Sequence, residues 1–249
     1  MSGHSKFANI KHKKERNDSA RAKVFTRLGR ELAVAVKSGG ADPASNMRLK
    51  EIIVKARANN MSGDTIDRSI KKAAGDLNAV NFESVTYEGY GPNGAAVIVR
   101  VLTDNRNRAA ANVRNAFTKG GGNMGTTGCV SFQFREKGLI MIEKDALVDA
   151  KPALDEDGLM MLALDAGAED FITSIEGCEI ITAPENFSSV LDSIEKSGVA
   201  SVSAEITMLP DVFVNLSDES DVKKMRKLLD LLDEEDDVQD VFHNWENEE

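Results

Sequence analysis

Residues 84–103, SVTYEGYGPNGAAVIVRVLT, decide the fold because they carry the first clear strand pattern in the chain. Two segments with β-branched and aromatic residues, 84–90 and 95–103, flank Gly91-Pro-Asn-Gly94, and Pro followed by Asn-Gly favours a tight turn. The pattern predicts two neighbouring strands. Residues before this stretch have helical periodicity, whereas residues after it alternate between strands and helices.

The region that follows predicts the remainder of a sheet. A helix capped by Asp104 is expected to end at glycines 120–122, and a strand is expected at 129–134. The glycine-rich segment 120–128 follows a helix and lacks the Gly-Lys-Ser/Thr ending of a P-loop, so we interpret it as a flexible connection. A helix at 220–232 and a strand at 238–245, near the far end of the chain, supply the elements that this unit lacks.

Between these two parts the sequence predicts a complete β-α-β-β-α-β unit, which is the ferredoxin-like plan. Its elements are expected at 139–143, 159–166, 170–175, 179–182, 187–197 and 202–208. We therefore predict an α+β (mixed α/β) chain in which a helical bundle is followed by two small α/β domains. The predicted bounds are a basic helical domain at 1–76, a discontinuous α/β domain at 77–136 plus 211–249, and an inserted ferredoxin-like domain at 137–210.

Charge is distributed unevenly along the chain. Residues 1–75 hold 17 Lys and Arg against 7 Asp and Glu, whereas residues 145–249 hold 6 against 28, within a net charge of -10. Clustered cations suit a phosphate backbone, because each neutralised phosphate releases condensed counterions. Three amphipathic helices are expected in the basic segment, at 17–39, from about 45, and at 62–74, each with a cationic outer face. The basic segment is therefore the expected nucleic-acid-binding end.

Other functional classes find little support. No apolar run approaches the roughly 18 residues of a membrane span, and the basic first residues do not resemble a secretory signal. The two cysteines and three histidines have no metal-ligand or disulfide spacing, and no catalytic motif is present. We interpret the acidic run 233–237 as a solvated surface. We predict a cytoplasmic, non-enzymatic protein without cofactor, metal or membrane contact. The sequence leaves the oligomeric state open, and its small domains and acidic surface favour a monomer.

Two short segments carry further candidate residues. Residues 3–16 interleave cations with Phe7 and Ile10, whose side chains either pack on the helical bundle or stack on unpaired bases. Residues 104–108 place two arginines at a helix start, where the helix dipole prefers anions. This placement indicates an anionic ligand; the alternative is an Asp104 cap with solvated arginines.

Four segments resemble the signature motifs of the YebC/PmpR family, and the likeness extends over essentially the whole chain. They are GHSKFANIKHK at 3–13, KARANNM at 55–61, YEGYGP at 87–92 and TDNRNR at 103–108. Phe7 stands where the family usually has tryptophan, and Ala109 where a hydroxyl residue is common. The resemblance implies a three-domain α/β protein that acts as a cytoplasmic DNA-binding transcriptional regulator, or as a ribosome-associated factor related to a mitochondrial translational activator.

We predict a non-enzymatic regulator of gene expression that binds DNA or ribosomal RNA, with the ribosome as a further expected partner. The sequence has no obvious helix-turn-helix reader, which favours folded RNA or backbone contact over base readout. The alternative is an interaction scaffold whose basic end docks an acidic protein. The predicted nucleic-acid-binding residues are Lys6, Phe7, Asn9, Lys11, His12, Lys13, Lys14, Arg16, Lys23, Arg27, Arg30, Lys37, Arg48, Lys55, Arg57, Asn59, Asn60, Arg68, Lys71, Lys72, Arg106 and Arg108.

Overall fold

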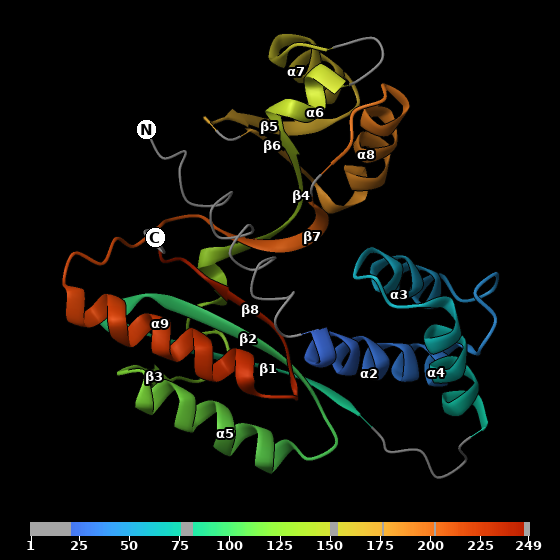
Figure 1. Cartoon of the computed structure of the whole chain (residues 1–249). Helices are drawn as coiled ribbons and strands as arrows, with labels where there is room; N and C mark the ends of the chain where they lie inside the picture. The colour runs from blue at the N-terminus through green and yellow to red at the C-terminus, as the bar shows by residue number, and fades with distance from the viewer. Residues whose placement is uncertain (1–20, 76–81, 150–153, 176, 202, 247–249) are drawn as a thin grey trace. The chain divides into compact units, whose positions relative to one another are not determined.

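The computed structural model describes residues 21–75, 82–149, 154–175, 177–201 and 203–246. Within them lie eight α-helices and two four-stranded antiparallel sheets, which confirms the predicted mixed α/β class (Figure 1). Contacts divide the chain into two compact units. Among the described residues, the larger unit comprises 21–131 and 216–243, and the smaller unit comprises 132–215 and 244–246. The three-domain division with the bounds given above stays a proposal.

The larger unit begins with three helices, α2 (Arg21–Gly39), α3 (Met47–Ala58) and α4 (Gly63–Gly75). Their apolar faces form one core, in which Leu28, Leu32 and Leu49 are buried. Asn46 closes the turn between the first two helices. Its amide donates to the carbonyls of Ala35 and Gly40, both at 2.8 Å, and its oxygen caps α3 at Leu49 N. The bundle therefore has the helical periodicity that the sequence predicts.

The sheet of the larger unit contains β1 (Glu83–Tyr90), β2 (Ala96–Thr103), β3 (Asn123–Met124) and β8 (Val238–His243), in the order β3-β1-β2-β8. All described neighbours are antiparallel. The predicted turn is confirmed: Asn93 and Gly94 take positive φ angles of 51° and 79°. Strand β2 is central, and all of its residues except Arg100 are buried.

Two helices lie side by side on one face of this sheet, α5 (Arg106–Lys119) and α9 (Glu219–Glu234) (Figure 1). They approach so closely that a Cβ atom on Gly120 would collide with Leu228. Met225, Leu228, Leu229 and Leu232 form the buried side of α9. Residues far apart in the sequence thus complete one sheet and its helical layer.

The predicted strand at 129–134 is wrong. Residues 131–133 form a 3-10 turn, Phe134 begins a strand of the other sheet, and the third strand of this sheet lies earlier, at β3. The cause is the buried carboxylate of Glu88, which accepts hydrogen bonds from the N–H groups of Gly128 (2.8 Å), Val130 (2.9 Å) and Ser131 (2.8 Å). A side chain therefore satisfies the backbone donors that a strand ladder would have used.

The smaller unit has the predicted β-α-β-β-α-β order, with sheet order β5-β6-β4-β7. This arrangement confirms the ferredoxin-like plan. Ile140, Ile142, Leu159, Ile180 and Ile194 are fully buried in its core. The short helix α6 was not predicted. The elements are β4 (Phe134–Glu143), α6 (Lys144–Asp149), α7 (Glu156–Asp165), β5 (Ala168–Thr173), β6 (Gly177–Thr182), α8 (Phe187–Lys196) and β7 (Ser203–Pro210).

Replacing Glu88 tests how strongly its carboxylate orders residues 128–131. Glu88→Ala is expected to lower the free energy of unfolding by about 3 kcal/mol, because three backbone donors lose a charged acceptor, and Glu88→Gln by less. Burial opposes ionisation, yet these hydrogen bonds lower the pKa of Glu88 below its ordinary value of 4.5. Its contribution is therefore present above that pH and is lost as the pH falls below it.

Chemical denaturation at neutral and acidic pH measures this effect. Glu83→Ala, which removes an exposed carboxylate from the same strand, is the control. Equal stabilities of Glu88→Ala and Glu83→Ala would show that the carboxylate does not order the segment.

Candidate nucleic-acid interface

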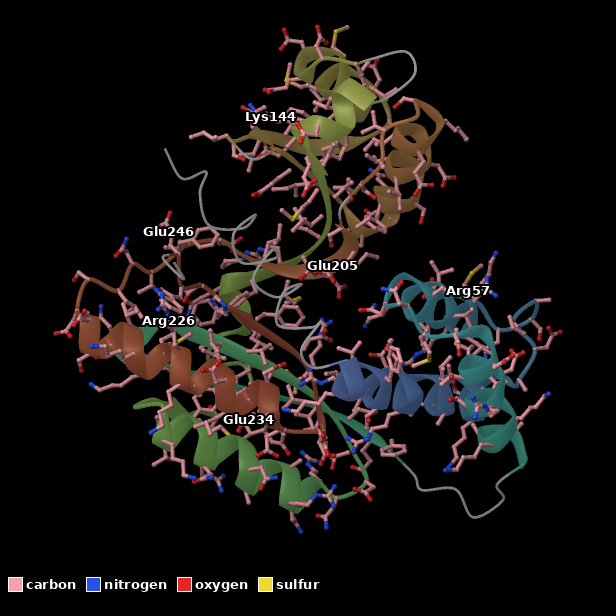
Figure 2. All side chains as sticks on the ribbon, in the orientation of Figure 1. Arg57, Lys144, Glu205, Arg226, Glu234 and Glu246 are labelled. Atoms are coloured by element: carbon pink, nitrogen blue, oxygen red, sulfur yellow. The ribbon has the colours of Figure 1, made fainter. Side chains whose placement is uncertain are left out.

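Exposed cations lie on the outer faces of α3 and α4. Arg48, Lys50 and Arg57 project from α3, and Lys71 and Lys72 from α4; Arg57 is labelled in Figure 2. None of these five forms an ion pair with another residue in the described part of the chain. Arg68, also on α4, is exposed, and its Nε donates to its own helix at the carbonyl of Asp64. These cations are therefore available to an external anion.

The outer face of α3 also carries apolar side chains, which the sequence analysis missed. Met47 and Val54 are 69% and 60% exposed. Their positions relative to Lys50 and Arg57, three or four residues apart, place all four on one face of the helix. The helical spacing that predicts the buried side of α3 also places Met47 and Val54 on its exposed side, so the sequence did contain a signal for them. The face combines positive charge with apolar surface.

Two predicted residues of α2 are already paired. Arg27 Nη1 lies 3.0 Å from Asp233 Oδ1, and its Nη2 donates to the Asp233 carbonyl at 2.6 Å. Arg30 Nη1 donates to Asp237 Oδ1 at 2.7 Å and to the Asp236 carbonyl at 2.5 Å. The two side chains are only 15% and 20% exposed. The cationic outer face expected on α2 is therefore not exposed at Arg27 and Arg30, because residues 233–237 cover them.

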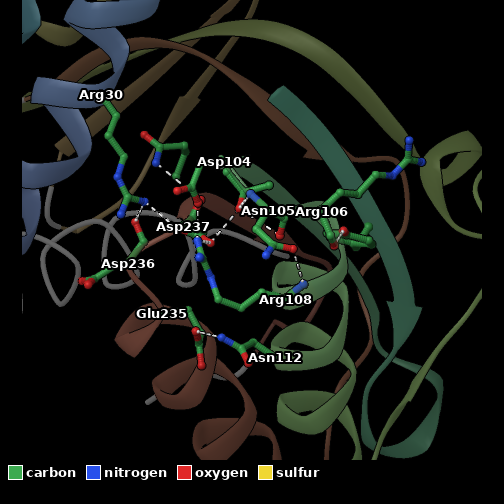
Figure 3. Close-up of polar contacts among 12 residues, drawn as sticks. Arg30, Asp104, Asn105, Arg106, Arg108, Asn112, Glu235, Asp236 and Asp237 are labelled. Atoms are coloured by element: carbon green, nitrogen blue, oxygen red, sulfur yellow. Dashed lines mark hydrogen bonds and ion pairs between the residues drawn. The ribbon is translucent and has the colours of Figure 1, made fainter. Parts of the chain in front are cut away.

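Asp237 is the centre of this contact (Figure 3). Besides Arg30, it accepts hydrogen bonds from Arg108 Nη2 at 2.9 Å and Thr103 Oγ1 at 2.8 Å. The residue is 7% exposed, so the interpretation of the whole acidic run as solvated is wrong here. Burial alone would raise the pKa of Asp237, but the hydrogen bonds from Arg108 and Thr103 and the charge of Arg30 lower it.

The two arginines at the start of α5 point in different directions. The helix is capped by Asn105, whose Oδ1 accepts from Arg108 N at 3.0 Å, and not by Asp104 as predicted. Asp104 instead accepts from the Arg108 guanidinium at 2.5 Å. Figure 3 shows Arg108 turned into the cluster around Asp237 and Arg106 pointing away from it. The structure therefore does not bring these two arginines together.

A polar cleft of about 470 Å³ borders the Asp237 cluster. Arg30 and Arg108 line it, but so do Asp104 and the four acids at 234–237. Asn112 donates to Glu235 across the gap between α5 and α9 at 2.7 Å. Because acids outnumber cations and both arginines are already paired, the cleft does not suit a phosphate.

The remaining predicted residues fall into two groups. Lys6, Phe7, Asn9, Lys11, His12, Lys13, Lys14 and Arg16 lie outside the described residues. Of the others, Lys23 is half-buried on α2, Lys37 is exposed near its end, and Lys55 pairs with Glu31 at 3.3 Å. Asn59 and Asn60 end α3: the Asn59 amide donates to the Lys55 carbonyl, and Asn60 takes a φ of 59°. Their contact with nucleic acid stays a prediction.

No helix among the described residues is long and apolar enough to cross a membrane. The described residues also contain no group of three or more His, Cys, Asp or Glu side chains arranged to hold a metal ion.

Comparisons with known proteins give consistent matches over the chain. Residues 5–76 match the TACO1/YebC protein N-terminal domain, and residues 82–245 match the TACO1/YebC second and third domain. A "probable transcriptional regulatory protein" of Lachnoclostridium phytofermentans is 62% identical, covering 99% of this chain and 100% of the relative. One from Acetivibrio thermocellus is 55% identical and covers 100% of each. The crystal structure of a conserved hypothetical protein from Aquifex aeolicus has a TM-score of 0.77 at 43% identity, covering 92% of this chain and 91% of that one.

Asp237→Asn tests the buried ion-pair cluster. At neutral pH we expect it to lower the free energy of unfolding by about 3 kcal/mol, because two arginines lose their shared carboxylate. The folded-state pKa of Asp237 lies below its ordinary value of 3.8. Its stabilisation is therefore present above that pH and disappears as the pH falls through the lower folded value, so the wild-type and variant curves should converge in acid.

Thermal unfolding between neutral pH and strong acid measures this difference. Asp236→Asn is the matched control, because Arg30 contacts Asp236 through its backbone carbonyl and not its side chain. A pH-independent gap between wild type and Asp237→Asn would contradict the role of the charge.

Proposed function

The chain belongs to the TACO1/YebC family, and on that premise we propose that it is a non-enzymatic regulator of gene expression that binds nucleic acid through its basic first 76 residues. The name "probable transcriptional regulatory protein", which close relatives carry, supports the regulatory role. The observation that carries the binding role is the set of exposed cations on α3 and α4 that have no ion-pair partner among the described residues.

The basic segment contains two kinds of cation, those that pair with acidic residues of the chain and those that face solvent. Arg27 and Arg30 are mostly buried against the acids at 233–237, and we assign them to holding α2 in place. Arg48, Arg57, Lys71 and Lys72 face solvent, where a phosphate replaces only water. Because each cation that neutralises a phosphate releases counterions, these residues supply affinity without any change in the fold.

The arrangement favours contact with a nucleic-acid backbone over base reading. The free cations are spread over two helices, and the exposed side chain of Val54 lies between Lys50 and Arg57 on α3. Sequence readers of duplex DNA instead place a polar recognition face in the major groove. We therefore propose folded RNA, including RNA in the ribosome, as the preferred target, and duplex DNA as the competing one.

A salt series tests this proposal. Arg48→Ala, Arg57→Ala, Lys72→Ala is compared with wild type in co-sedimentation with purified ribosomes and in fluorescence anisotropy with a duplex DNA oligonucleotide. We expect wild type to bind ribosomes with an affinity that falls steeply with salt. The variant should bind more weakly, with a slope of log K against log salt reduced by about 2.1 to 2.7, which is about 0.7 to 0.9 per lost phosphate contact.

The control is Lys144→Ala, Lys196→Ala, Lys223→Ala, which removes three cations from other parts of the chain. If this control and the variant of Arg48, Arg57 and Lys72 have equal slopes of log K against log salt, the phosphate contacts are not made by these cations of α3 and α4. Absence of saturable binding by wild type to both probes would overturn the proposal. Binding to ribosomes that does not change with salt would favour the alternative, docking of a protein partner.

A further inference from the structure

Helix α5 carries positive charge outside the basic first 76 residues. Its 14 residues include Arg106, Arg108, Arg114 and Lys119 and no acid. Arg108 is held in the Asp237 cluster, whereas the other three are exposed and have no ion pair within the described part of the chain. Most of the residues between them are neutral, among them the small exposed Ala111. The exposed side of α5 is thus a positively charged surface.

Arg106 and Arg114 belong to one edge of this surface. They are eight residues apart, about 12 Å along a helix that rises 1.5 Å per residue. Tyr87 of β1 contacts the start of this helix: its hydroxyl donates to the Arg106 carbonyl at 3.2 Å. Burial raises the pKa of Tyr87, and the positive charges of Arg106 and Arg114 partly offset that rise. Two guanidiniums therefore lie near one aromatic residue that is fixed to the helix start.

The position of Arg106 is unfavourable within the helix itself. A cation in the first turn opposes the helix dipole, which favours an acid there. Arg108, in the same turn, is compensated by Asp104 and Asp237. Arg106 points away from those carboxylates (Figure 3) and has no acidic partner among the described residues. An anion from outside the chain would supply the missing compensation, and the free N–H groups of a helix start attract the same ligand.

We propose that Arg106 and Arg114 form a second nucleic-acid contact, in which their guanidiniums bind phosphates of the bound nucleic acid. Tyr87 is a positioning residue that holds the start of α5 against β1. Asn107, exposed on the same side of the helix, provides a further hydrogen-bond donor. This inference rests on the proposed function and extends the phosphate contacts from the helical bundle to the sheet of the larger unit.

The first test is Arg106→Ala, Arg114→Ala in the ribosome and duplex-DNA salt series. Loss of two phosphate contacts should reduce the slope of log K against log salt by about 1.4 to 1.8. Lys144→Ala, Lys196→Ala removes the same charge from the smaller unit and should leave the slope at the wild-type value. A slope for the arginine variant equal to that of this control would overturn the inference.

A second variant separates binding from folding. Arg106→Glu places an acid in the first turn of α5, which the helix dipole favours, so its melting temperature should equal or exceed that of wild type. Its affinity should fall further than that of Arg106→Ala, because a carboxylate repels phosphate. Tyr87→Phe should weaken binding without changing the salt slope, because it removes no phosphate contact. Unchanged affinity of Arg106→Glu would contradict the inference.

The outcomes distinguish this inference from the function on which it rests. If wild type binds neither probe, both are overturned. If the variant of Arg48, Arg57 and Lys72 loses slope while the variant of Arg106 and Arg114 matches its control, the proposed function stands and only the contact on α5 is overturned.

Discussion

The buried carboxylate of Asp237 is the interaction on which the larger unit depends. Removing an ion from water costs several kcal/mol unless charged partners and hydrogen bonds replace the solvent. Arg30, Arg108 and Thr103 provide these, from α2, from α5 and from the end of β2. The backbone carbonyl of Asp237 also accepts from Leu102 N at 2.8 Å, beside the irregularity where β8 changes register on β2. Asp237 thus connects α2 of the helical bundle, the start of α5 and the strand β8.

This contact also determines which cations are free. A guanidinium that already shares a carboxylate gains little from a phosphate, because it must first give up a paired, partly desolvated contact. Arg27, Arg30 and Arg108 are of this kind, whereas Arg57 and Arg106 face solvent. The acids at 233–237, all at or after the end of α9, would also repel a nucleic acid locally. The positively charged surfaces proposed for binding are therefore the outer faces of α3, α4 and α5.

Apolar periodicity predicted most of the fold, because the spacing of buried residues is a local property. It identified the helices that bury Leu28 and Leu49 and the β-α-β-β-α-β order of the ferredoxin-like unit, although not its short helix α6. The errors have a different origin. The strand expected at 129–134 fails because Glu88, some 40 residues earlier, binds the backbone there. The burial of Asp237 depends on Arg30, 207 residues away. A single sequence counts these charges but does not say which of them meet.

Three positively charged helix faces on one unit would select a nucleic acid by the arrangement of its phosphates. Phosphate contacts position a nucleic acid but carry no sequence information directly. With Arg57 and Arg106 on separate helices, a ligand that reaches both surfaces must present phosphates in a matching spatial arrangement, and folded RNA offers more such arrangements than a straight duplex does. On the proposed function, discrimination therefore comes from the shape of the backbone and not from the identity of the bases.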